Sequence, residues 1–190
     1  MDTGRRLVVG LGNPGARYAA TRHNAGALVL QLLAERLGVR FKAHKSRCEI
    51  AETRLAGEPV VLARPLSYMN ESGGPIVGAA RFFKVSVEDV VVVHDELDLP
   101  FGALRIKRGG GDGGHNGLRS TTSSLGSKDY LRVRFGIGRP PGRQDPADYV
   151  LREFAAAERK ELPFLLDRAA DAVEALVERG LDAAQNEYNE

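Results

Sequence analysis

The sequence lacks the features of secreted and membrane-embedded proteins. It has one cysteine among 190 residues, and neither acidic nor basic residues predominate. A lone Cys48 excludes an internal disulfide and is typical of a reducing compartment. The first apolar run, residues 7–11, is far too short for a signal-peptide core or a membrane-spanning helix. We therefore expect a cytoplasmic protein that makes no contact with a membrane.

The size and bulk composition are those of an ordinary globular protein. A length of 190 residues is close to the ~150 residues of one domain. A chain of this size buries roughly 70% of its unfolded surface, so its core needs no covalent staples. Apolar residues make up 43% of the chain and charged residues 27%, as in most such proteins. We predict one domain that spans residues 1–190.

Charge and glycine are unevenly distributed along the chain. The net charge of +2 does not by itself indicate a nucleic-acid partner. However, residues 101–143 hold nine Lys and Arg against two Asp and Glu, a net charge of +7. Residues 144–190 hold five against twelve, a net charge of −7. The basic segment also contains 11 of the 22 glycines, a combination that indicates contact with phosphate groups.

Hydrophobic periodicity predicts alternating strands and helices. Asn24 is interpreted as the N-cap of the first helix and Gly38 as its C-terminal stop. The alternation, with one inserted hairpin, predicts an α/β fold: a single domain with a twisted mixed β-sheet covered by helices on both faces. In such sheets ligands bind at the carboxyl ends of the strands. The predicted strands are 7–11, 49–55, 59–63, 90–93, 104–107 and 131–137, and the predicted helices are 25–37, 70–84, 115–125 and 158–179.

Two glycine-rich segments invite comparison with nucleotide-binding loops. Residues 10–15 match G-x-G-x-x-G after a strand, which raises a nicotinamide or flavin interpretation. That fingerprint opens a helix at once, whereas Pro14 and further polar residues follow here. Residues 109–114 lack the Gly-Lys-Ser/Thr ending of a P-loop. Their backbone N–H groups can nevertheless approach a ligand closely.

Polar residues after two predicted strands suggest acid–base chemistry. Asp95, Glu96 and Asp98 follow a valine-rich strand, where they could bind Mg²⁺, form a polar turn or orient a histidine. His23 follows the first strand. If the two strands are neighbours, a His–Asp pair could activate water. The spacing of the four histidines is not that of a zinc site, and Cys48 is interpreted as a core residue.

Amide and tyrosine side chains lie on the same predicted side of the sheet. Asn13, Asn70 and Asn116 each offer a donor and an acceptor without charge. Tyr18 and Tyr68 can stack on a base or a ribose. Together with the basic segment, these residues favour an RNA-linked substrate with an uncharged scissile group.

Five blocks, in order along the chain, resemble the bacterial-type peptidyl-tRNA hydrolase family. The first contains Val-Gly-Leu-Gly-Asn-Pro-Gly and Thr-Arg-His-Asn-Ala-Gly, and the others include His-Asp-Glu-Leu-Asp-Leu-Pro and the glycine run. The resemblance implies hydrolysis of the ester that joins a peptide, or an N-blocked aminoacyl group, to the terminal ribose of tRNA. Such hydrolysis recycles tRNA from aborted translation. The blocks lie at residues 9–26, 68–73, 94–100, 109–117 and 134–138.

The resemblance also implies roles for individual residues. His23 would be the general base that activates water, Asp95 would hold it in the basic form, and Asn13 would contact the substrate. A second set would bind the peptide and the acceptor end: Tyr18, Tyr68, Asn70, Asn116 and His115. A third set would contact tRNA phosphates: Lys107, Arg134 and Arg105. The charge distribution, rather than the resemblance, further predicts a basic patch at one end of the active-site groove and an acidic C-terminal part that faces away from the tRNA body.

The resemblance further implies that no metal or organic cofactor is needed and that tRNA is the partner of a monomeric enzyme. Two rival functions stay open. One is an RNA-binding protein without catalysis, although binding alone requires neither His23 nor Asp95. The other is a dinucleotide-dependent oxidoreductase that rests on residues 10–15 alone.

Overall fold

The computed structural model of the chain describes residues 4–189. Within that range, seven strands form one sheet in the order β2-β3-β4-β1-β5-β7-β6. The strands are β1 (Arg6–Gly10), β2 (Lys42–Ala43), β3 (Cys48–Leu55), β4 (Glu58–Pro65), β5 (Val90–Glu96), β6 (Leu104–Arg108) and β7 (Leu131–Gly136). Strands β4, β1, β5 and β7 run parallel, while β2, β3 and β6 pair in the antiparallel direction. The predicted mixed sheet is confirmed.

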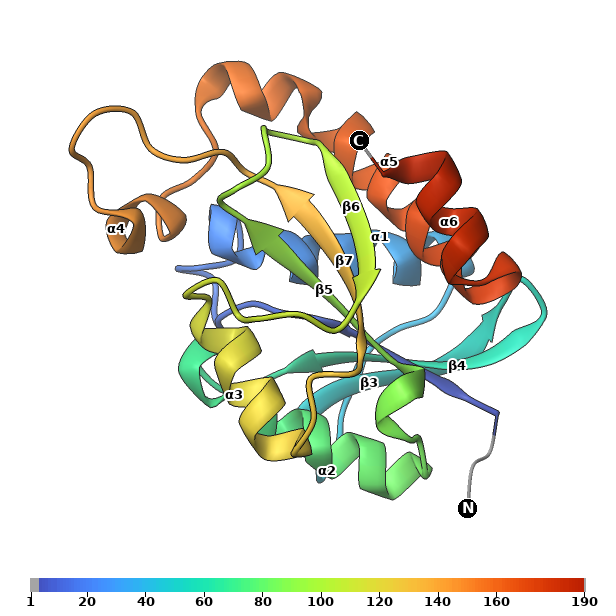
Figure 1. The fold of residues 1–190 in the computed structure, drawn as a ribbon. Coiled ribbons are helices and arrows are strands. Elements are labelled where there is room, and N and C mark those ends of the chain that lie inside the picture. Colours follow the sequence, from blue (N-terminus) through green and yellow to red (C-terminus); the bar gives the residue numbers. More distant parts are fainter. Residues whose placement is uncertain (1–3, 190) are drawn as a thin grey trace.

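Helices cover both faces of the sheet, as predicted (Figure 1). Helices α1, α5 and α6 pack on one face, and α2 and α3 pack on the other. Among the described residues, no helix combines the length and the apolar composition that crossing a membrane requires. The helices are α1 (Ala25–Leu37), α2 (Gly73–Phe83), α3 (Asn116–Leu125), α4 (Pro146–Val150), α5 (Ala156–Arg179) and α6 (Leu181–Tyr188), with 3₁₀ turns η1 (Arg22–Asn24), η2 (Met69–Glu71) and η3 (Val87–Asp89).

Strand β5 lies inside the sheet, between β1 and β7, and is buried on both faces. Val91 and Val93 belong to the core under α1 and α5, whereas Val90 and Val92 belong to the core under α2. A strand covered on both faces has a continuous apolar sequence, which explains the four consecutive valines. Because side chains alternate along a strand, Asp95 follows Val93 toward the α1 side.

The ends of helix α1 show where local sequence decides the structure and where it does not. Gly38 ends the helix as predicted, with a left-handed φ of 68° and its N–H directed to the carbonyl of Ala34. Asn24 occupies the predicted N-cap position, but its side chain makes no cap hydrogen bond. That side chain instead binds the backbone of Asn13. The predicted side-chain cap is therefore wrong, because a tertiary contact takes the same polar atoms.

Two glycines allow α1 to lie directly on the sheet. A Cβ atom at Gly26 would sit 2.1 Å from the carbonyl oxygen of Val93, and one at Gly10 would sit 2.4 Å from the carbonyl oxygen of Gly26. Real Cβ atoms do not approach backbone this closely, so only glycine fits at both positions. The close approach fixes the start of α1, and hence η1 with His23, beside the end of β5.

This close approach makes the stability of the fold sensitive to one methyl group. We expect Gly26→Ala to lower the free energy of unfolding by about 1–3 kcal/mol, the usual cost of overpacking. Gly78→Ala in α2 is the matched control, since its new Cβ would meet nothing closer than 3.5 Å. That control should be neutral or stabilising by up to ~1 kcal/mol through helix propensity. Urea denaturation measures both, and equal stability of the two variants would contradict the tight packing of α1.

Candidate active site

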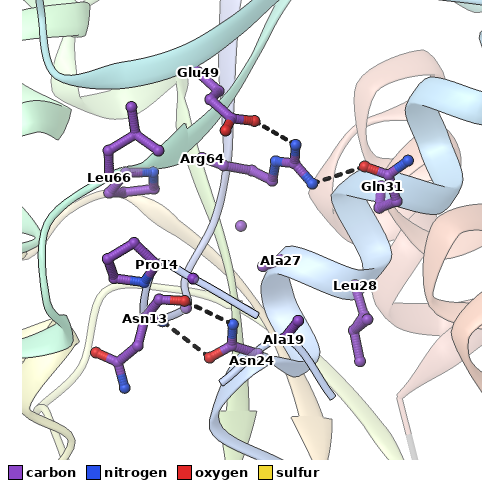
Figure 2. Close-up of a pocket in the computed structure, with 14 residues that line it drawn as sticks. Asn13, Pro14, Ala19, Asn24, Ala27, Leu28, Gln31, Glu49, Arg64 and Leu66 are labelled. Atoms are coloured by element: carbon purple, nitrogen blue, oxygen red, sulfur yellow. Dashed lines mark hydrogen bonds and ion pairs between the residues drawn. The ribbon is translucent and has the colours of Figure 1, made fainter. Parts of the chain in front are cut away.

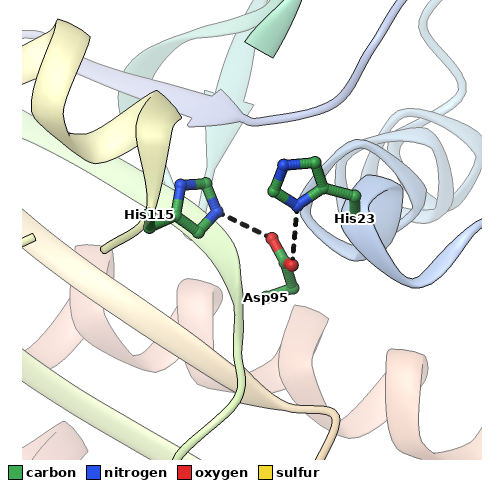
Figure 3. Close-up of side chains that lie close together, drawn as sticks. All are labelled: His23, Asp95 and His115. Carbon is green, nitrogen blue, oxygen red and sulfur yellow. Dashed lines mark hydrogen bonds and ion pairs between the residues drawn. The ribbon is translucent and has the colours of Figure 1, made fainter. Parts of the chain in front are cut away.

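The carboxyl ends of the parallel strands meet at one edge of the sheet, where α/β proteins bind ligands. The segment after β1 leads into η1, which carries His23. Asp95 lies near the end of β5, and His115 immediately precedes α3. Figure 3 shows the two histidine rings converging on the carboxylate of Asp95. Three segments that are distant in sequence thus supply one cluster.

Asp95 is hydrogen-bonded through both of its carboxylate oxygens. His23 Nδ1 lies 2.8 Å from Oδ2, and His115 Nε2 lies 2.8 Å from Oδ1. The Asp95 side chain is only 2% exposed, whereas that of His23 keeps 12%. No hydrogen bond within the described residues engages Nε2 of His23, which leaves this atom for a ligand or water.

Burial and hydrogen bonding set the charges of this pair. Burial by itself disfavours the charged form of Asp95, but the two histidines overcome it and hold the pKa of the carboxyl well below its usual range. Burial likewise disfavours the protonated form of His23. The charge and hydrogen bond of Asp95 nevertheless raise the pKa of His23 above its ordinary value of 6.5. Asp95 is therefore an anion that makes His23 a stronger base.

His94 lies next to the cluster and takes no part in proton transfer with a ligand. Its side chain is buried, and its Nδ1 lies 2.8 Å from the backbone carbonyl oxygen of Asp95, to which it donates. Burial, and then the neighbouring His115, lower the pKa of His94 to about 3, so its ring is neutral. Its Nε2 atom is buried without a partner.

The loop after β1 fixes the orientation of Asn13. The side chain of Asn24 accepts from the backbone N–H of Asn13 and donates to its carbonyl, both at 2.9 Å (Figure 2). The side-chain Oδ1 of Asn13 accepts from the backbone N–H of Met69 at 2.7 Å. The Nδ2 group of Asn13 is then the end that remains to donate to a ligand. Sequence reasoning did not find this role of Asn24.

The other predicted peptide-binding residues surround the same edge. Asn70 lies in η2 and Asn116 opens α3, and these two elements are in contact. Both asparagines are exposed, and no hydrogen bond within residues 4–189 engages their side chains. The rings of Tyr18 and Tyr68 meet edge to face with centroids 6.3 Å apart. The structure thus brings the predicted polar and aromatic residues together.

The three predicted phosphate-binding residues and a fourth cation, Arg132, form a two-by-two cluster on the paired strands β6 and β7, here called the grid of cations. In the pairing of β6 with β7, Arg105 lies opposite Arg134, and Lys107 lies opposite Arg132. All four side chains occupy the face opposite the apolar side chains of these strands. Burial, followed by Arg134 and Arg132, lowers the pKa of Lys107. Cations placed opposite each other repel, so an anion bound here would relieve that repulsion.

Sequence patterns did not single out Arg132, although strand alternation places it on the same face as Arg134. Its side chain is buried and lies over the ring of Tyr130 at 4.5 Å. Its guanidinium donates to the carbonyls of Gly111 at 2.6 Å and Gly110 at 2.8 Å. A Cβ at Gly110 would lie 2.5 Å from Lys107 Nζ. Arg132 therefore holds the glycine backbone against which Lys107 packs.

The acidic residues at the end of β5 and just beyond it do not converge on a magnesium site. Asp95 is occupied by the two histidines, and Glu96 lies 3.8 Å from Arg134. Asp98 accepts from Arg139 at 2.7 Å. Each of the three carboxylates thus has its own cationic or donor partners, and the magnesium alternative is not supported.

The ligand atoms of the histidine–aspartate cluster are close enough together to hold a metal ion, but the hydrogen bonds of His115 differ from those of a metal ligand. Ligand atoms of His23, Asp95 and His115 lie within 4.8 Å of one another, a grouping that sequence spacing did not reveal. A metal-bound histidine normally donates its second ring N–H to an acceptor. The second nitrogen of His115 instead accepts from the backbone N–H groups of Gly117 and Leu118. This donor set does not fit a resident metal.

A separate cavity of about 380 Å³ lies between β1, α1 and the end of β4. Arg64 crosses it, bound to Glu49 and, at 2.7 Å, to Gln31. Figure 2 shows that Asn13 borders this cavity with its side chain turned away from it. The backbone of the loop after β1 thus lines one side of this cavity, while the side chain of Asn13 points away from it.

Known proteins match nearly the whole chain in sequence and in fold. The family model described as peptidyl-tRNA hydrolase matches residues 7–190. The peptidyl-tRNA hydrolase of Frankia casuarinae is 66% identical over 96% of this chain and 93% of its own, and that of Nocardia farcinica is 64% identical over 99% and 98%. The crystal structure of peptidyl-tRNA hydrolase from Acinetobacter baumannii superposes with a TM-score of 0.91 at 35% identity, covering 100% of this chain and 98% of that one.

The buried Arg132 side chain and its hydrogen bonds to the glycine loop predict a large loss of stability when it is replaced. We expect Arg132→Met to lower the free energy of unfolding by about 1–3 kcal/mol, because the buried Arg132 guanidinium is lost and the carbonyls of Gly110 and Gly111 lose their donor. Arg134→Met is the matched control and should cost less than about 1 kcal/mol, since Arg134 forms one long ion pair. Urea denaturation measures both variants. An equal destabilisation of the two would show that the hydrogen bonds from Arg132 to the loop add nothing.

Proposed function

The chain belongs to the peptidyl-tRNA hydrolase family, and we propose that it hydrolyses the ester between a peptide, or an N-blocked aminoacyl group, and the terminal ribose of tRNA. The observation that carries the proposal is the His23–Asp95 hydrogen bond of 2.8 Å at the carboxyl edge of the sheet. The grid of cations on β6 and β7 supports a phosphate-bearing substrate. Mere RNA binding has no need of a buried His–Asp pair.

His23 acts as the general base. Asp95 Oδ2 accepts a hydrogen bond from the N–H at Nδ1. The proton therefore stays on Nδ1, and the lone pair of Nε2 is free to take a proton from water. As the water attacks the ester carbonyl, His23 becomes positively charged, and the adjacent carboxylate stabilises that charge. When the tetrahedral intermediate collapses, the bond from the carbonyl carbon to the ribose oxygen breaks, and His23 returns its proton to that departing oxygen. General-base assistance of this kind is worth about 10²–10⁴-fold in rate. An ester needs no stronger activation than one positioned base.

Asn13 stabilises the oxyanion that forms on the carbonyl. Its Oδ1 is held by the N–H of Met69, which directs Nδ2 as the donor. Such a preorganised donor contributes roughly 3 kcal/mol to the transition state. Asn24 supports it by clamping the backbone of Asn13 on both sides.

The remaining site residues bind the two parts of the substrate. Asn70 and Asn116 hydrogen-bond the peptide backbone or the acceptor end, beside the rings of Tyr18 and Tyr68. Contacts to phosphate supply affinity without reading base sequence, as an enzyme that serves many tRNAs requires. The phosphate contacts come from Lys107, Arg134 and Arg105. Helices α5 and α6 lie across the sheet from these cations, which supports an acidic C-terminal part turned away from the tRNA.

Substitution of the base tests the chemistry directly. We expect His23→Asn to lower kcat for deacylation of N-acetylaminoacyl-tRNA by about 10²–10⁴-fold while tRNA affinity stays within twofold. His44→Asn is the control, because His44 packs against Phe82 outside the site and should keep the full rate. A folded His23 variant with undiminished activity would remove His23 as the base. A wild-type protein that binds tRNA without releasing the acyl group would favour the RNA-binding rival.

Salt dependence tests the binding of phosphate by the cations. In a plot of log K against log salt concentration, removal of one cation that binds a phosphate should make the negative slope less steep by about 0.7–0.9. We expect this change for Lys107→Gln and for Arg134→Gln in tRNA binding titrations. Arg54→Gln also removes one positive charge, but near the β3–β4 turn, on the side of the sheet away from β6 and β7. This variant should leave the slope unchanged. Equal slopes in all three variants would refute the assignment.

A further inference from the structure

We propose that His115 is a positioning residue, which holds the Asp95 carboxylate through a proton that the start of helix α3 confines to its Nε2 atom. The proposal rests on the function given above and deepens it. It replaces the expectation that His115 binds the substrate. Which nitrogen of the ring carries the proton is decided by the surrounding backbone.

The backbone of α3 fixes the tautomer of His115. Its Nδ1 accepts from the N–H of Gly117 at 3.1 Å and from the N–H of Leu118 at 3.3 Å. Backbone N–H groups can only donate, so Nδ1 must carry a lone pair. In a neutral ring the proton is then on Nε2, which lies 2.8 Å from Asp95 Oδ1. His115 thus serves as the N-cap of α3 and as a donor to the catalytic carboxylate at once.

The surroundings of the His115 ring leave neither of its nitrogens free to bind a ligand. It lies between two other histidines, with ring centroids 4.9 Å from His23 and 5.3 Å from His94. Its side chain is 10% exposed, and both of its nitrogens are engaged by protein. The titratable or charged groups that face this cluster are Asp95, His23, His94 and, behind His94, Arg132. A ligand that bound His115 would have to displace Asp95 or uncap α3.

The bond from His115 has two consequences for the base. It fixes the plane of the carboxylate, so that Oδ2 points at His23 Nδ1. It also spreads the negative charge of Asp95 over two partners, because Oδ1 accepts a hydrogen bond from a second N–H. Without His115, that charge would act on His23 alone. His115 therefore aligns His23 and limits how strongly Asp95 favours its protonated form.

The test uses His115→Asn, since asparagine can cap a helix but is too short to reach Asp95. With N-acetylaminoacyl-tRNA, we expect kcat to fall about 10–100-fold through misalignment, with KM within twofold. Wild-type kcat/KM should decline on the acid side with a midpoint above 6.5, because Asp95 raises the pKa of His23. In the variant this midpoint should move to higher pH. Asn116→Ala, which removes the neighbouring substrate contact, should instead raise KM and leave the midpoint in place.

A rise in KM with unchanged kcat and unchanged midpoint would return His115 to substrate binding and overturn the proposal. An independent readout does not need activity or a variant. Imidazole ¹⁵N spectra of the wild-type protein should show His115 protonated at Nε2 and bare at Nδ1. The opposite tautomer would overturn the proposal even if the enzyme is fully active. Conversely, an inactive wild-type protein with the expected tautomer would refute the proposed function and leave the hydrogen-bond assignment intact.

Discussion

Helix α1 approaches the sheet so closely that a methyl group on Gly26 would collide with the carbonyl of Val93. The site depends on this close approach. His23 lies just before the start of α1 and Asp95 lies just beyond Val93 on β5, so the position of the helix on the sheet sets the separation of the two side chains. A bulkier residue would lift the start of α1 and lengthen the His23–Asp95 hydrogen bond. The hydrogen bond and the glycine pair are therefore parts of one constraint.

The sheet also separates the two charge excesses of the chain. The cations of β6 and β7 lie on one face, while the acidic helices α5 and α6 lie on the other. Their charges cancel in the total of +2 but not in space, because fields from groups about a Debye length or more apart, ~8–10 Å, are screened by salt. A phosphate that approaches β6 and β7 from the side of their cationic side chains therefore encounters mainly positive charge. Net charge is a poor guide to the partner of a protein whose sheet divides its charges in this way.

The fold and the central pair were accessible to sequence reasoning, because both rest on periodic patterns and on strand order. Valine-rich β5 and glycine-flanked α1 follow from such patterns, and neighbouring parallel strands bring His23 and Asp95 together. Helix 70–84 was predicted as one element, yet the chain forms η2 and then α2, and α6 was not predicted. Asn24 and Arg132 were misjudged or missed for a shared reason. Their polar atoms bind backbone carbonyls and amides of distant segments, and no local pattern encodes those partners.

The glycine loop between β6 and α3 connects the cations of β6 and β7 to the histidine–aspartate cluster. Arg132 of β7 binds the loop carbonyls just after β6, and His115 fixes the other end of the loop to Asp95 and to the first turn of α3. Glycine adds no side chain to stiffen such a loop, and several of its residues adopt positive φ. Its shape must therefore come from hydrogen bonds supplied by the surrounding structure. Because both anchors are buried and polar, releasing either one leaves unpaired groups inside the protein. These two anchors hold one end of the loop beside the cations of β6 and β7 and the other end beside the Asp95–His23 hydrogen bond.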